Sequence, residues 1–541
     1  MLRRRHRWVD MRRFHPLFGA RVSAVVVFAL AMAACSSLRP DFVKNPSNAL
    51  PPVTDTPSAR YIAGELSQHG NDSGFRLLTK STNALMSRVA LADQARHSID
   101  LQYYIFKNDE TGRLLAQRLL AAADRGVRVR MLLDDISLTD EDRMLDALDA
   151  HPNIQVRLFN PFNTRDPSLI SKIGQFVLEG RRLNRRMHNK SFIVDGNVAI
   201  IGGRNIGNDY FDAGDTTNFR DLDLLAIGSV VHEASRIFDD YWNSDAAYPV
   251  TAFRKLHDTQ DDLLSLRTAL KRDARAFAQS DYAQAALDDM PAGASGDRRG
   301  DWFWAQAVVV ADEPDKVDPG SGGDAATLRI GPTLKTMVDN AHEEVLLVSP
   351  YFVPGDNGTR FLTTLTQRGV TVRVLTNSLA STDEPAVHSG YAHYRRALLQ
   401  GGVQLYELQP ATGAPQPATA AGTSSGVSLH AKAMVVDGAH VFIGSMNMDQ
   451  RSKLLNTEMG VIIDSAPLAQ AVEKFFDTAI EPGNAYQVVL QASPDNRKRT
   501  RMTWLWSEKG VARHAYSDPK ATRMRRLEVS LLGLLPIEGL L

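Results

Sequence analysis

The chain has 541 residues, of which 43% are hydrophobic and 23% charged, so it is long enough to bury two sizeable cores. Its 62 basic and 62 acidic residues cancel, and a formal net charge of zero gives no sign of nucleic-acid binding. A single cysteine excludes a disulfide within the chain and a metal site built from several cysteines.

The N-terminal segment has the order of a secretory signal. Residues 1–21 carry seven arginines and no lysine, and the apolar stretch Val22–Ala34 that follows is too short to span a bilayer comfortably. It ends in Met32-Ala33-Ala34-Cys35-Ser36, which resembles a bacterial lipobox. That resemblance implies that residues 1–34 are a signal peptide and that Cys35 is lipidated.

An uncleaved N-terminal anchor with a free thiol at Cys35 is the alternative. Both interpretations predict a membrane-anchored protein, and several lipid chains would hold it firmly. The lipoprotein interpretation places the protein at the periplasmic side of a bacterial membrane. Ser36 after the cysteine favours the outer membrane.

Residues 35–70 are predicted to be a lipidated tether, because Ser36–Ser58 is polar and rich in proline. The first domain is expected over residues 71–250. It begins with a strand-like run, Ser98–Phe106, a helical stretch, Arg113–Ala123, and a second strand after Gly126.

A hairpin carries the first motif of this domain. Apolar, β-rich runs flank Asp195-Gly196, a turn signal. His188 and Lys190 are two apart on the expected strand and therefore point to the same face. Asp195 lies about 23 Å beyond His188 along an extended strand, so it is expected to fix the turn. The return strand brings Gly202, Gly203 and Asn205 back beside His188.

The same pattern, H-x-K-x4-D-x6-G-[GS]-x-N, occurs a second time. Residues 251–325 are predicted to form connecting helices and a loop, and residues 326–490 a second domain that contains His430, Lys432, Asp437, Gly444 and Asn447. The repeat reaches upstream, since Gly126 precedes His188 by 62 residues and Gly369 precedes His430 by 61. The fold class is therefore α/β, with two duplicated domains, mixed sheets and a shared site at their interface.

Residues 491–541 form a basic and aromatic C-terminal tail. Residues 497–506 combine a cluster of cations with two tryptophans, and Arg523, Arg525 and Arg526 precede an apolar run, Val529–Leu535. Such a pattern suits an anionic lipid surface. An ordinary C-terminal helix packed on the second domain is the alternative.

The paired motif and several further segments resemble the phospholipase D superfamily, and within it the bacterial cardiolipin synthase C branch. The resemblance covers roughly residues 75 to 541. The segments that carry the branch resemblance are residues 157–162, 183–192, 202–207, 451–452, 456–458 and 534–538.

Two histidines around one phosphodiester permit a covalent mechanism. One neutral imidazole attacks phosphorus, and the other, protonated, donates to the departing alcohol. The resemblance implies that His188 is the nucleophile and His430 the general acid and base. Non-bridging oxygens would be held by Lys190, Lys432, Asn205 and Asn447. This mechanism requires no metal and no cofactor. The alternative to the catalytic interpretation is that the two motifs are merely structural hairpins.

Carboxylates on the far imidazole nitrogens are expected to fix the tautomers. Glu458 is the candidate in the second domain and Asp223, at the matching strand start, in the first. The lysines are expected to lower the pKa of the histidines.

The resemblance implies phosphatidyl transfer between phospholipids, which gives cardiolipin. Phosphatidylglycerol is then the acceptor and phosphatidylethanolamine a possible donor. A hydrolase that makes phosphatidic acid is the first alternative, and a non-enzymatic lipid-binding protein is another. A nuclease is disfavoured by the zero net charge. The expected partners are phospholipids and a membrane, with no nucleic acid, and the sequence identifies no accessory protein.

Overall fold

The computed structural model describes residues 44–136, 142–162, 179–214, 217–253, 259–289, 302–318, 330–410, 426–492, 500–535 and 539. The predicted signal peptide and Cys35 lie outside these residues. Among the described residues, no helix combines the length and hydrophobicity that a membrane span requires.

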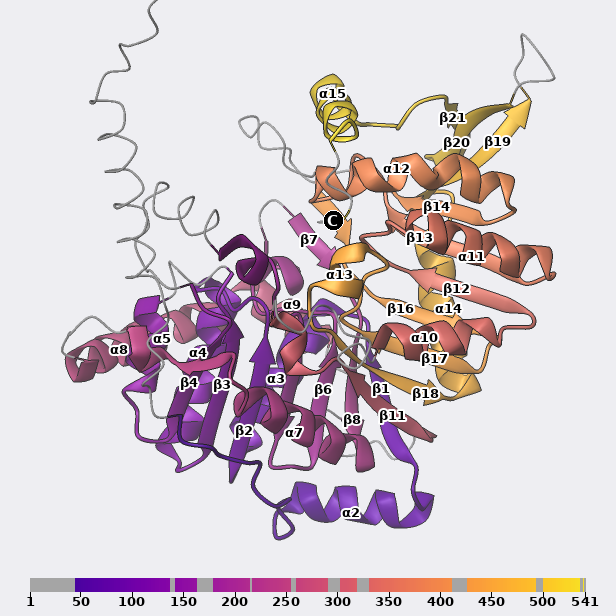
Figure 1. The fold of residues 1–541 in the computed structure, drawn as a ribbon. Helices are drawn as coiled ribbons and strands as arrows, with labels where there is room; N and C mark the ends of the chain where they lie inside the picture. Colours follow the sequence, from indigo (N-terminus) through magenta and orange to yellow (C-terminus); the bar gives the residue numbers. More distant parts are fainter. Residues whose placement is uncertain are drawn as a thin grey trace, which may run out of the picture. The chain divides into compact units, whose positions relative to one another are not determined.

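A nine-stranded mixed sheet organises the first half of the chain (Figure 1). Its central strands β2, β3 and β4 are parallel, whereas the hairpin β5–β6 and the outer strands are antiparallel. In spatial order the strands are β10 (Phe303–Ala305), β1 (Ser73–Leu78), β8 (Asp223–Ile227), β6 (Val198–Gly202), β5 (Ser191–Val194), β2 (Ser98–Tyr103), β3 (Arg128–Asp134), β4 (Ile154–Phe159) and β9 (Ala247–Pro249).

A ten-stranded mixed sheet organises the second half and repeats this plan. The parallel trio is now β12, β13 and β14, and the hairpin is β16–β17. In spatial order the strands are β11 (Ala307–Ala311), β18 (Met459–Asp464), β17 (His440–Gly444), β16 (Ala433–Val436), β12 (Glu344–Val348), β13 (Thr371–Asn377), β14 (Gln404–Leu408), β19 (Ala485–Ala492), β20 (Thr500–Glu508) and β21 (Val511–Ala515).

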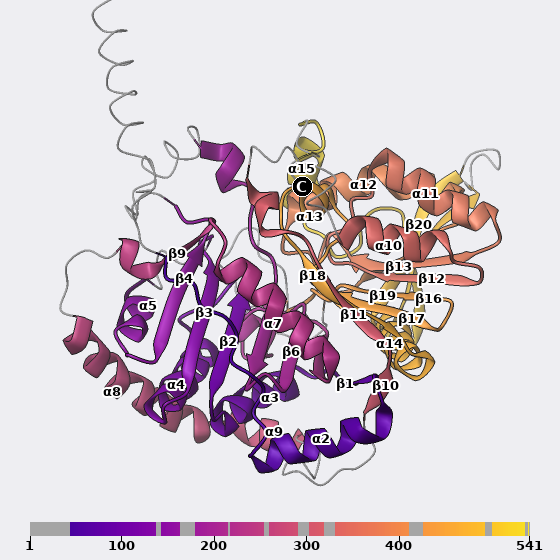
Figure 2. The ribbon, with the colours of Figure 1, turned by 60° about the horizontal axis from the view of Figure 1, so that its bottom comes forward.

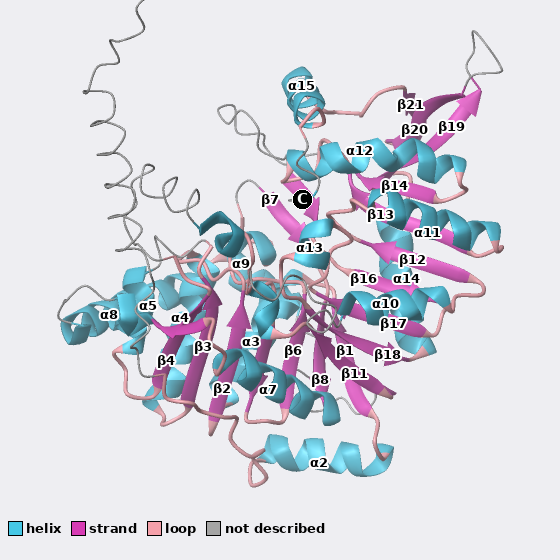
Figure 3. Cartoon of the chain, viewed as in Figure 1, coloured by secondary structure: helices cyan, strands magenta, loops and turns pink. Residues whose placement is uncertain are grey.

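Helices flank both sheets (Figure 3). Those of the first half are α3 (Ser81–Gln94), α4 (Glu110–Asp124), α5 (Asp142–Asp149), α7 (Ser229–Trp242), α8 (Thr259–Ala278) and α9 (Asp281–Asp289). Those of the second are α10 (Ile330–Asp339), α11 (Gly355–Gln367), α12 (Pro385–Gln400), α13 (Gln450–Leu454), α14 (Ala466–Ile480) and α15 (Arg523–Leu532). Side-chain caps fix several starts, for example Asp109 before α4 and Ser465 before α14.

The two halves share one hydrophobic core. It joins residues of β6 and β8, such as Ile201 and Leu224, to residues of β17 and β18, such as Ile443 and Val461, with α7 and α14 packed against it. Separate clusters lie under α3 and α4 in the first half and under α10, α11 and α12 in the second. The expected duplication of an α/β unit with mixed sheets is confirmed, and a common core holds the two copies together.

Equivalent glycines end the first long helix of each copy. Gly126 after α4 has a φ of 93°, and Gly369 after α11 has a φ of 91°. A left-handed residue at this position lets the chain leave the helix and enter β3 or β13, and glycine adopts it without steric cost. The upstream repeat in the sequence therefore marks the same helix-to-strand turn twice.

The structure differs from the expected tether. From residue 44 the chain lies along the first half. Arg130 Nη1 donates to the Ser47 carbonyl at 2.7 Å, and the Val53 N–H donates to the Asp195 carbonyl at 3.0 Å. The helix α2 (Pro57–His69) then leads into β1. A polar, proline-rich composition did not reveal these contacts, because extended chain satisfies its backbone on any neighbouring surface.

The connecting segment and the tail are also more integrated than predicted. The strands β10 and β11 are separated by Gln306 alone, yet β10 pairs in the first sheet and β11 in the second (Figure 2). The helix α8 packs on α4. In the tail, β20 and β21 extend the second sheet, and Trp504 Nε1 donates to Glu407 at 2.9 Å in its interior.

Candidate active site

Each histidine motif lies immediately before the first strand of a hairpin. The hairpin strand β5 starts at Ser191 and β16 at Ala433, so the histidines and lysines occupy the extended segments that lead into them. The expected strands, Met187–Val194 and Leu429–Val436, thus each begin four residues later than predicted. Each lysine still folds back onto its histidine, since Lys190 Nζ donates to the His188 backbone carbonyl and Lys432 Nζ to the His430 backbone carbonyl, each at 2.5 Å.

The backbone of each histidine is held by the opposite half of the chain. The His188 N–H donates to the Thr457 carbonyl at 2.9 Å, beside a parallel bridge between Met187 and Thr457. In the second half, β15 (Gly426–Leu429) pairs in parallel with β7 (Thr217–Arg220), and the His430 N–H donates to the Arg220 carbonyl at 2.8 Å. The two motifs therefore meet at the interface of the two halves.

The carboxylates that contact the imidazoles also cross this interface. His188 Nδ1 lies 2.8 Å from Glu458 Oε2, and His430 Nδ1 lies 2.5 Å from Asp221 Oδ2. Both carboxylates are fully buried. An ionised carboxylate accepts the Nδ1 proton, which leaves the lone pair of a neutral imidazole on Nε2.

Asp223 does not contact an imidazole, which corrects the sequence-based prediction. Its Oδ2 lies 3.0 Å from Arg88 Nη2 and 3.3 Å from Arg204 Nη1, so it belongs to a buried ion cluster beneath the site. The sheet register explains the error. Gly202 pairs with Asp223 and Gly444 with Gly460, so the residue equivalent to Glu458 is Asp221, two residues earlier.

Burial and neighbouring charges set the protonation of the two carboxylates. Burial opposes ionisation of Asp221, but His430, Lys432 and Arg204 outweigh it and lower its pKa to about 2. Burial likewise acts to raise the pKa of Glu458, and its contacts with His188, Lys190 and Ser445 lower it. Both carboxylates are therefore negative at neutral pH.

In the histidines and lysines, burial outweighs the neighbouring carboxylates and favours the uncharged form. Burial, reinforced by Lys190, lowers the pKa of His188 to about 4, and burial with Lys432 lowers that of His430 to about 3. Burial and the nearby second lysine lower the pKa of Lys190 to about 7, and burial lowers that of Lys432 to about 8. Two neutral imidazoles thus lie beside two lysines whose ammonium forms a bound anion would stabilise.

The asparagines lie at the same end of the hairpins as the histidines. Asn205 Oδ1 accepts the Ile105 N–H at 3.2 Å, and the side chain also interacts with Tyr210, whose ring centroid lies 5.2 Å from that of His430. Asn447 is buried, and its N–H donates to Ser452 Oγ at 3.3 Å. The positions fit a role in holding an anion, which stays a prediction.

Asp195 and Asp437 occupy the far ends of the hairpins. Each has a positive φ, 53° and 51°, in the turn. Asp195 accepts the N–H groups of residues 96–98, which lead into β2, and Asp437 those of residues 342–344, which lead into β12. As expected, each aspartate belongs to the turn, and beyond the turn each fastens the start of a neighbouring strand.

Sequence reasoning missed Asp134 and Asn377, which hold the residue before each histidine. Asp134 Oδ2 accepts the Met187 N–H at 2.8 Å, and Asn377 Oδ1 accepts the Leu429 N–H at 2.8 Å. They are equivalent ends of β3 and β13, since Val129 pairs with Ile99 as Val372 does with Val345. Asp134 and Asn377 each stand eight residues after the repeated glycine, Gly126 or Gly369, so the upstream repeat carries the signal that could have found them.

Aromatic rings pack against the histidines. The ring centroid of Tyr104 lies 4.9 Å from that of His188, and the centroid of Phe219 lies 5.0 Å from that of His430. Such edges exclude water around the imidazoles without competing for their nitrogens. No spacing rule in the sequence distinguished these rings from ordinary core residues.

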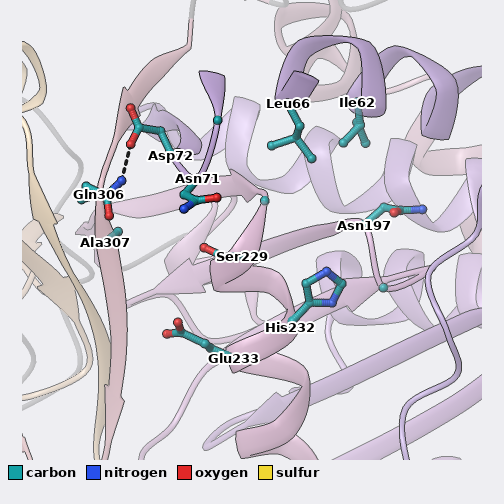
Figure 4. Close-up of a pocket in the computed structure, with 13 residues that line it drawn as sticks. Ile62, Leu66, Asn71, Asp72, Asn197, Ser229, His232, Glu233, Gln306 and Ala307 are labelled. Carbon is teal, nitrogen blue, oxygen red and sulfur yellow. Dashed lines mark hydrogen bonds between the residues drawn. The ribbon is translucent and has the colours of Figure 1, made fainter. Parts of the chain in front are cut away.

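A separate cavity lies at the other end of the first hairpin (Figure 4). It is bounded by α2, the Gly196–Asn197 turn and the start of α7, with Leu66, Asn197 and His232 among its lining residues. Gln306 Nε2 donates to Asp72 at 2.6 Å along one wall. Because the turn is opposite the histidine end of the hairpin, this cavity is not part of the candidate active site.

Comparison with known proteins agrees with this arrangement. A family profile described as "Cardiolipin synthase, PLD-like domain" matches residues 89–242 and 334–480. The chain is 39% identical to cardiolipin synthase C of Escherichia coli (strain K12), across 88% of this chain and 98% of that protein. It is 27% identical to a cardiolipin synthase of Geobacillus kaustophilus, across 72% of this chain and 62% of that protein.

A solved structure shows the same fold. The crystal structure of phosphatidylserine synthase from Haemophilus influenzae Rd KW20 superposes with a TM-score of 0.55 at 13% identity, covering 89% of this chain and 100% of that one. The two segments that match the family profile cover more than half of the chain, and each contains one of the two histidine motifs. One relative is also similar over nearly its whole length. The chain belongs to the cardiolipin synthase family of phospholipase D-like proteins.

Proposed function

We propose that this protein is a phosphatidyltransferase that makes cardiolipin from phosphatidylglycerol and a second phospholipid through a phosphohistidine intermediate. The observation that carries the proposal is the pair of crossed contacts, Glu458 with His188 and Asp221 with His430. They give two imidazoles with free Nε2 lone pairs in one buried site. One phosphodiester needs two such groups, a nucleophile and a proton donor.

In the first step His188 Nε2 attacks the phosphorus of the donor lipid. The bond from phosphorus to the headgroup oxygen breaks, and His430 Nε2 donates a proton to that oxygen. A protonated His430 requires a higher pKa than it has in the empty site, and the bound anionic phosphate supplies that increase. Lys190 and Lys432 stabilise the charge on the non-bridging oxygens.

In the second step the primary hydroxyl of phosphatidylglycerol replaces the departed alcohol. His430 Nε2 removes the hydroxyl proton, the oxygen attacks phosphorus, and the bond from phosphorus to His188 Nε2 breaks. The products are cardiolipin and the starting enzyme. Water in place of the hydroxyl would give phosphatidic acid, so the acceptor alone separates a transferase from a hydrolase.

Lipid analysis tests the reaction. Purified protein and His188→Ala are incubated with phosphatidylglycerol alone and with phosphatidylglycerol plus phosphatidylethanolamine, and the lipids are identified by mass spectrometry. We expect cardiolipin from the parent protein only, and the mixture identifies the donor. Phosphatidic acid without cardiolipin would mean that water is the acceptor.

Trapping tests the order of the histidines. With donor lipid labelled in its phosphate, His430→Ala is expected to accumulate label on His188, because the second step lacks its base. Peptide mapping under alkaline conditions, which preserve phosphohistidine, locates the label. Label on residue 430 in a His188→Ala protein would reverse the assignment.

We also propose that Cys35 is lipidated after removal of residues 1–34 and that the enzyme faces the periplasm. The sequence around Cys35 supports this proposal, together with lipid substrates that reside in membranes. The intact mass of detergent-extracted protein tests it. A mass that retains residues 1–34 would exclude the lipoprotein form.

A further inference from the structure

The C-terminal helix α15 has an apolar side that faces solvent. Met524, Leu527 and Leu531 are 70%, 54% and 57% exposed, and Leu534 and Leu535 just after the helix are 81% and 54% exposed. With about 100° between successive residues, positions 524, 527 and 531 form one stripe along the helix. Exposed leucines scattered singly are ordinary, but a continuous stripe of large apolar side chains indicates a surface that meets an apolar partner.

The opposite side of α15 is fixed to the second half of the protein. Arg525 is buried and donates to the Thr382 carbonyl, Arg526 Nη2 donates to that of Asp518 at 2.8 Å, and α15 packs on α12. Thr522 caps the helix by accepting the Arg525 N–H at 3.1 Å. These contacts fix the helix beyond α12 (Figure 1), and the exposed side chains of its apolar stripe face solvent.

This anchoring point lies at the rim of the candidate active site. Asp383, next to Thr382, accepts the Tyr351 hydroxyl at 2.7 Å and contributes to the electrostatic environment of Lys432. Thr382, which anchors α15, is thus adjacent to a residue that acts electrostatically on Lys432.

The charges on its margins favour an anionic surface. Arg523 is exposed on one margin of the stripe and Lys520 lies just before the helix, whereas the other margin carries a single acid, Glu528. Basic residues beside an apolar helical face are typical of helices that lie in the plane of an anionic bilayer, with the apolar side among the acyl chains.

We infer that α15, with Leu534 and Leu535, is an interfacial helix that docks the active-site rim on the surface of an anionic phospholipid bilayer. This inference rests on the proposed function, because a lipid substrate is what must pass from the bilayer to the histidines. It assigns to the helix a role in access to bilayer substrate and none in the chemistry at phosphorus.

Two substrates of the same headgroup separate these roles. One is phosphatidylglycerol in vesicles with phosphatidylcholine, and the other is a short-chain phosphatidylglycerol kept monomeric below its micelle concentration. In the full chain, Leu527→Glu with Leu531→Glu is expected to lower turnover on vesicles about tenfold or more, because two side chains that enter the acyl region become charged. Turnover of the monomeric lipid should stay within about twofold.

Leu264→Glu with Leu287→Glu is the matched control. These leucines are 62% and 53% exposed on α8 and α9 of the first half. The control should leave both activities unchanged. Equal turnover on vesicles by the α15 variant, or an equal loss on both substrates, would overturn the inference.

Hydrogen exchange gives a readout that does not depend on catalysis. In the parent protein, anionic vesicles should slow exchange over residues 523–535, and vesicles of phosphatidylcholine alone should do so less. Slowed exchange without any lipid turnover would leave the docking surface standing while the proposed function fails. Slowing that requires no vesicles and grows with protein concentration would instead show that a second copy covers the helix, and would overturn the inference.

Discussion

Asp221 and Asp223 are two residues apart and both fully buried, yet they have different partners. Asp221 contacts His430, whereas Asp223 neutralises Arg88 and Arg204. The first is placed to fix an imidazole tautomer and the second to hold two buried cations. At neighbouring positions, one aspartate thus contacts the candidate active site and the other belongs to a buried ion cluster.

We expect Asp221→Asn to lower kcat by about 10²–10⁴-fold with little loss of stability, because the amide keeps the shape but not the charge that orients the imidazole. Asp223→Asn should do the reverse and lower the free energy of unfolding by about 3–5 kcal/mol, since two buried guanidinium groups lose their counter-ion. Steady-state kinetics and urea unfolding of both proteins measure this contrast. Similar catalytic losses in the two variants would contradict the assignment of Asp221.

The lowered pKa values predict an unusual pH profile. In the free enzyme the histidines have pKa values near 4 and 3 and do not titrate near the ordinary histidine pKa of 6.5, so kcat/KM should show no inflection there. The ammonium forms of Lys190 and Lys432 are present below about pH 7 and 8 and are lost above, so kcat/KM should decline through that window.

Rates between pH 5 and 10 on the monomeric lipid test this profile. Lys190→Arg should move the alkaline decline upward, because a guanidinium keeps its charge. A decline on the acid side near pH 6.5 with none on the alkaline side would show that burial does not control the site as described.

At the scale of elements, the aspartate of each motif joins two strands. Asp437 accepts three backbone N–H groups ahead of β12, and Asp195 does the same ahead of β2. One end of each hairpin therefore carries the candidate active site, and the other end helps to assemble the sheet. A repeated residue in a catalytic motif need not touch the substrate.

Asp437→Ala is accordingly expected to reduce the free energy of unfolding by about 1–3 kcal/mol, from hydrogen bonds to a charged group, while kcat changes less than about twofold. Urea unfolding and lipid turnover of the same preparation provide the measurement. Lys432→Ala, five residues earlier, is the converse control, with activity lost and the fold kept. A large fall in kcat for Asp437→Ala would place this aspartate in the chemistry after all.

Residues that position the histidines also act at this scale. The ends of β3 and β13 present Asp134 and Asn377 to the N–H groups just before the two motifs. The last residue of each of these parallel strands thus fixes the backbone just before one histidine. Burial raises the pKa of Asp134 to about 6 against the opposing effect of Arg186. The structural role of Asp134 explains why a carboxyl group is buried here despite the desolvation of its charged form.

For the whole molecule, the shared core makes the two copies one folding unit. Ile443 on β17 belongs to the cluster that also contains Ile201 on β6, and β6 contacts both β17 and β18. Each copy also supplies the carboxylate for the other copy's histidine. Chemistry and stability therefore both depend on the interface.

Ile443→Ala is expected to cost about 2–5 kcal/mol and to lower hydrogen-exchange protection in β6 as well as in β17. Leu398→Ala on α12 is the matched control, because Leu398 lies in a cluster confined to the second half, and its effect should stay there. Loss of protection in β17 alone for Ile443→Ala would mean that the halves open independently.

The sequence by itself determined the duplicated α/β plan, the paired histidines, lysines and asparagines, and the two turns at Asp195 and Asp437. These features are local, because turn chemistry and a repeated spacing of residues specify them without knowledge of distant contacts. The family resemblance followed from the same repeated residues.

Only the tertiary structure decided which carboxylate meets which histidine. Along a strand, residues two apart face the same side, so periodicity cannot distinguish Asp221 from Asp223. The choice depends on the register between β6 and β8, and the crossed pairing with Glu458 depends on how the two halves pack. Such contacts between residues more than 200 positions apart arise from the fold as a whole, which is why spacing in the sequence did not predict them.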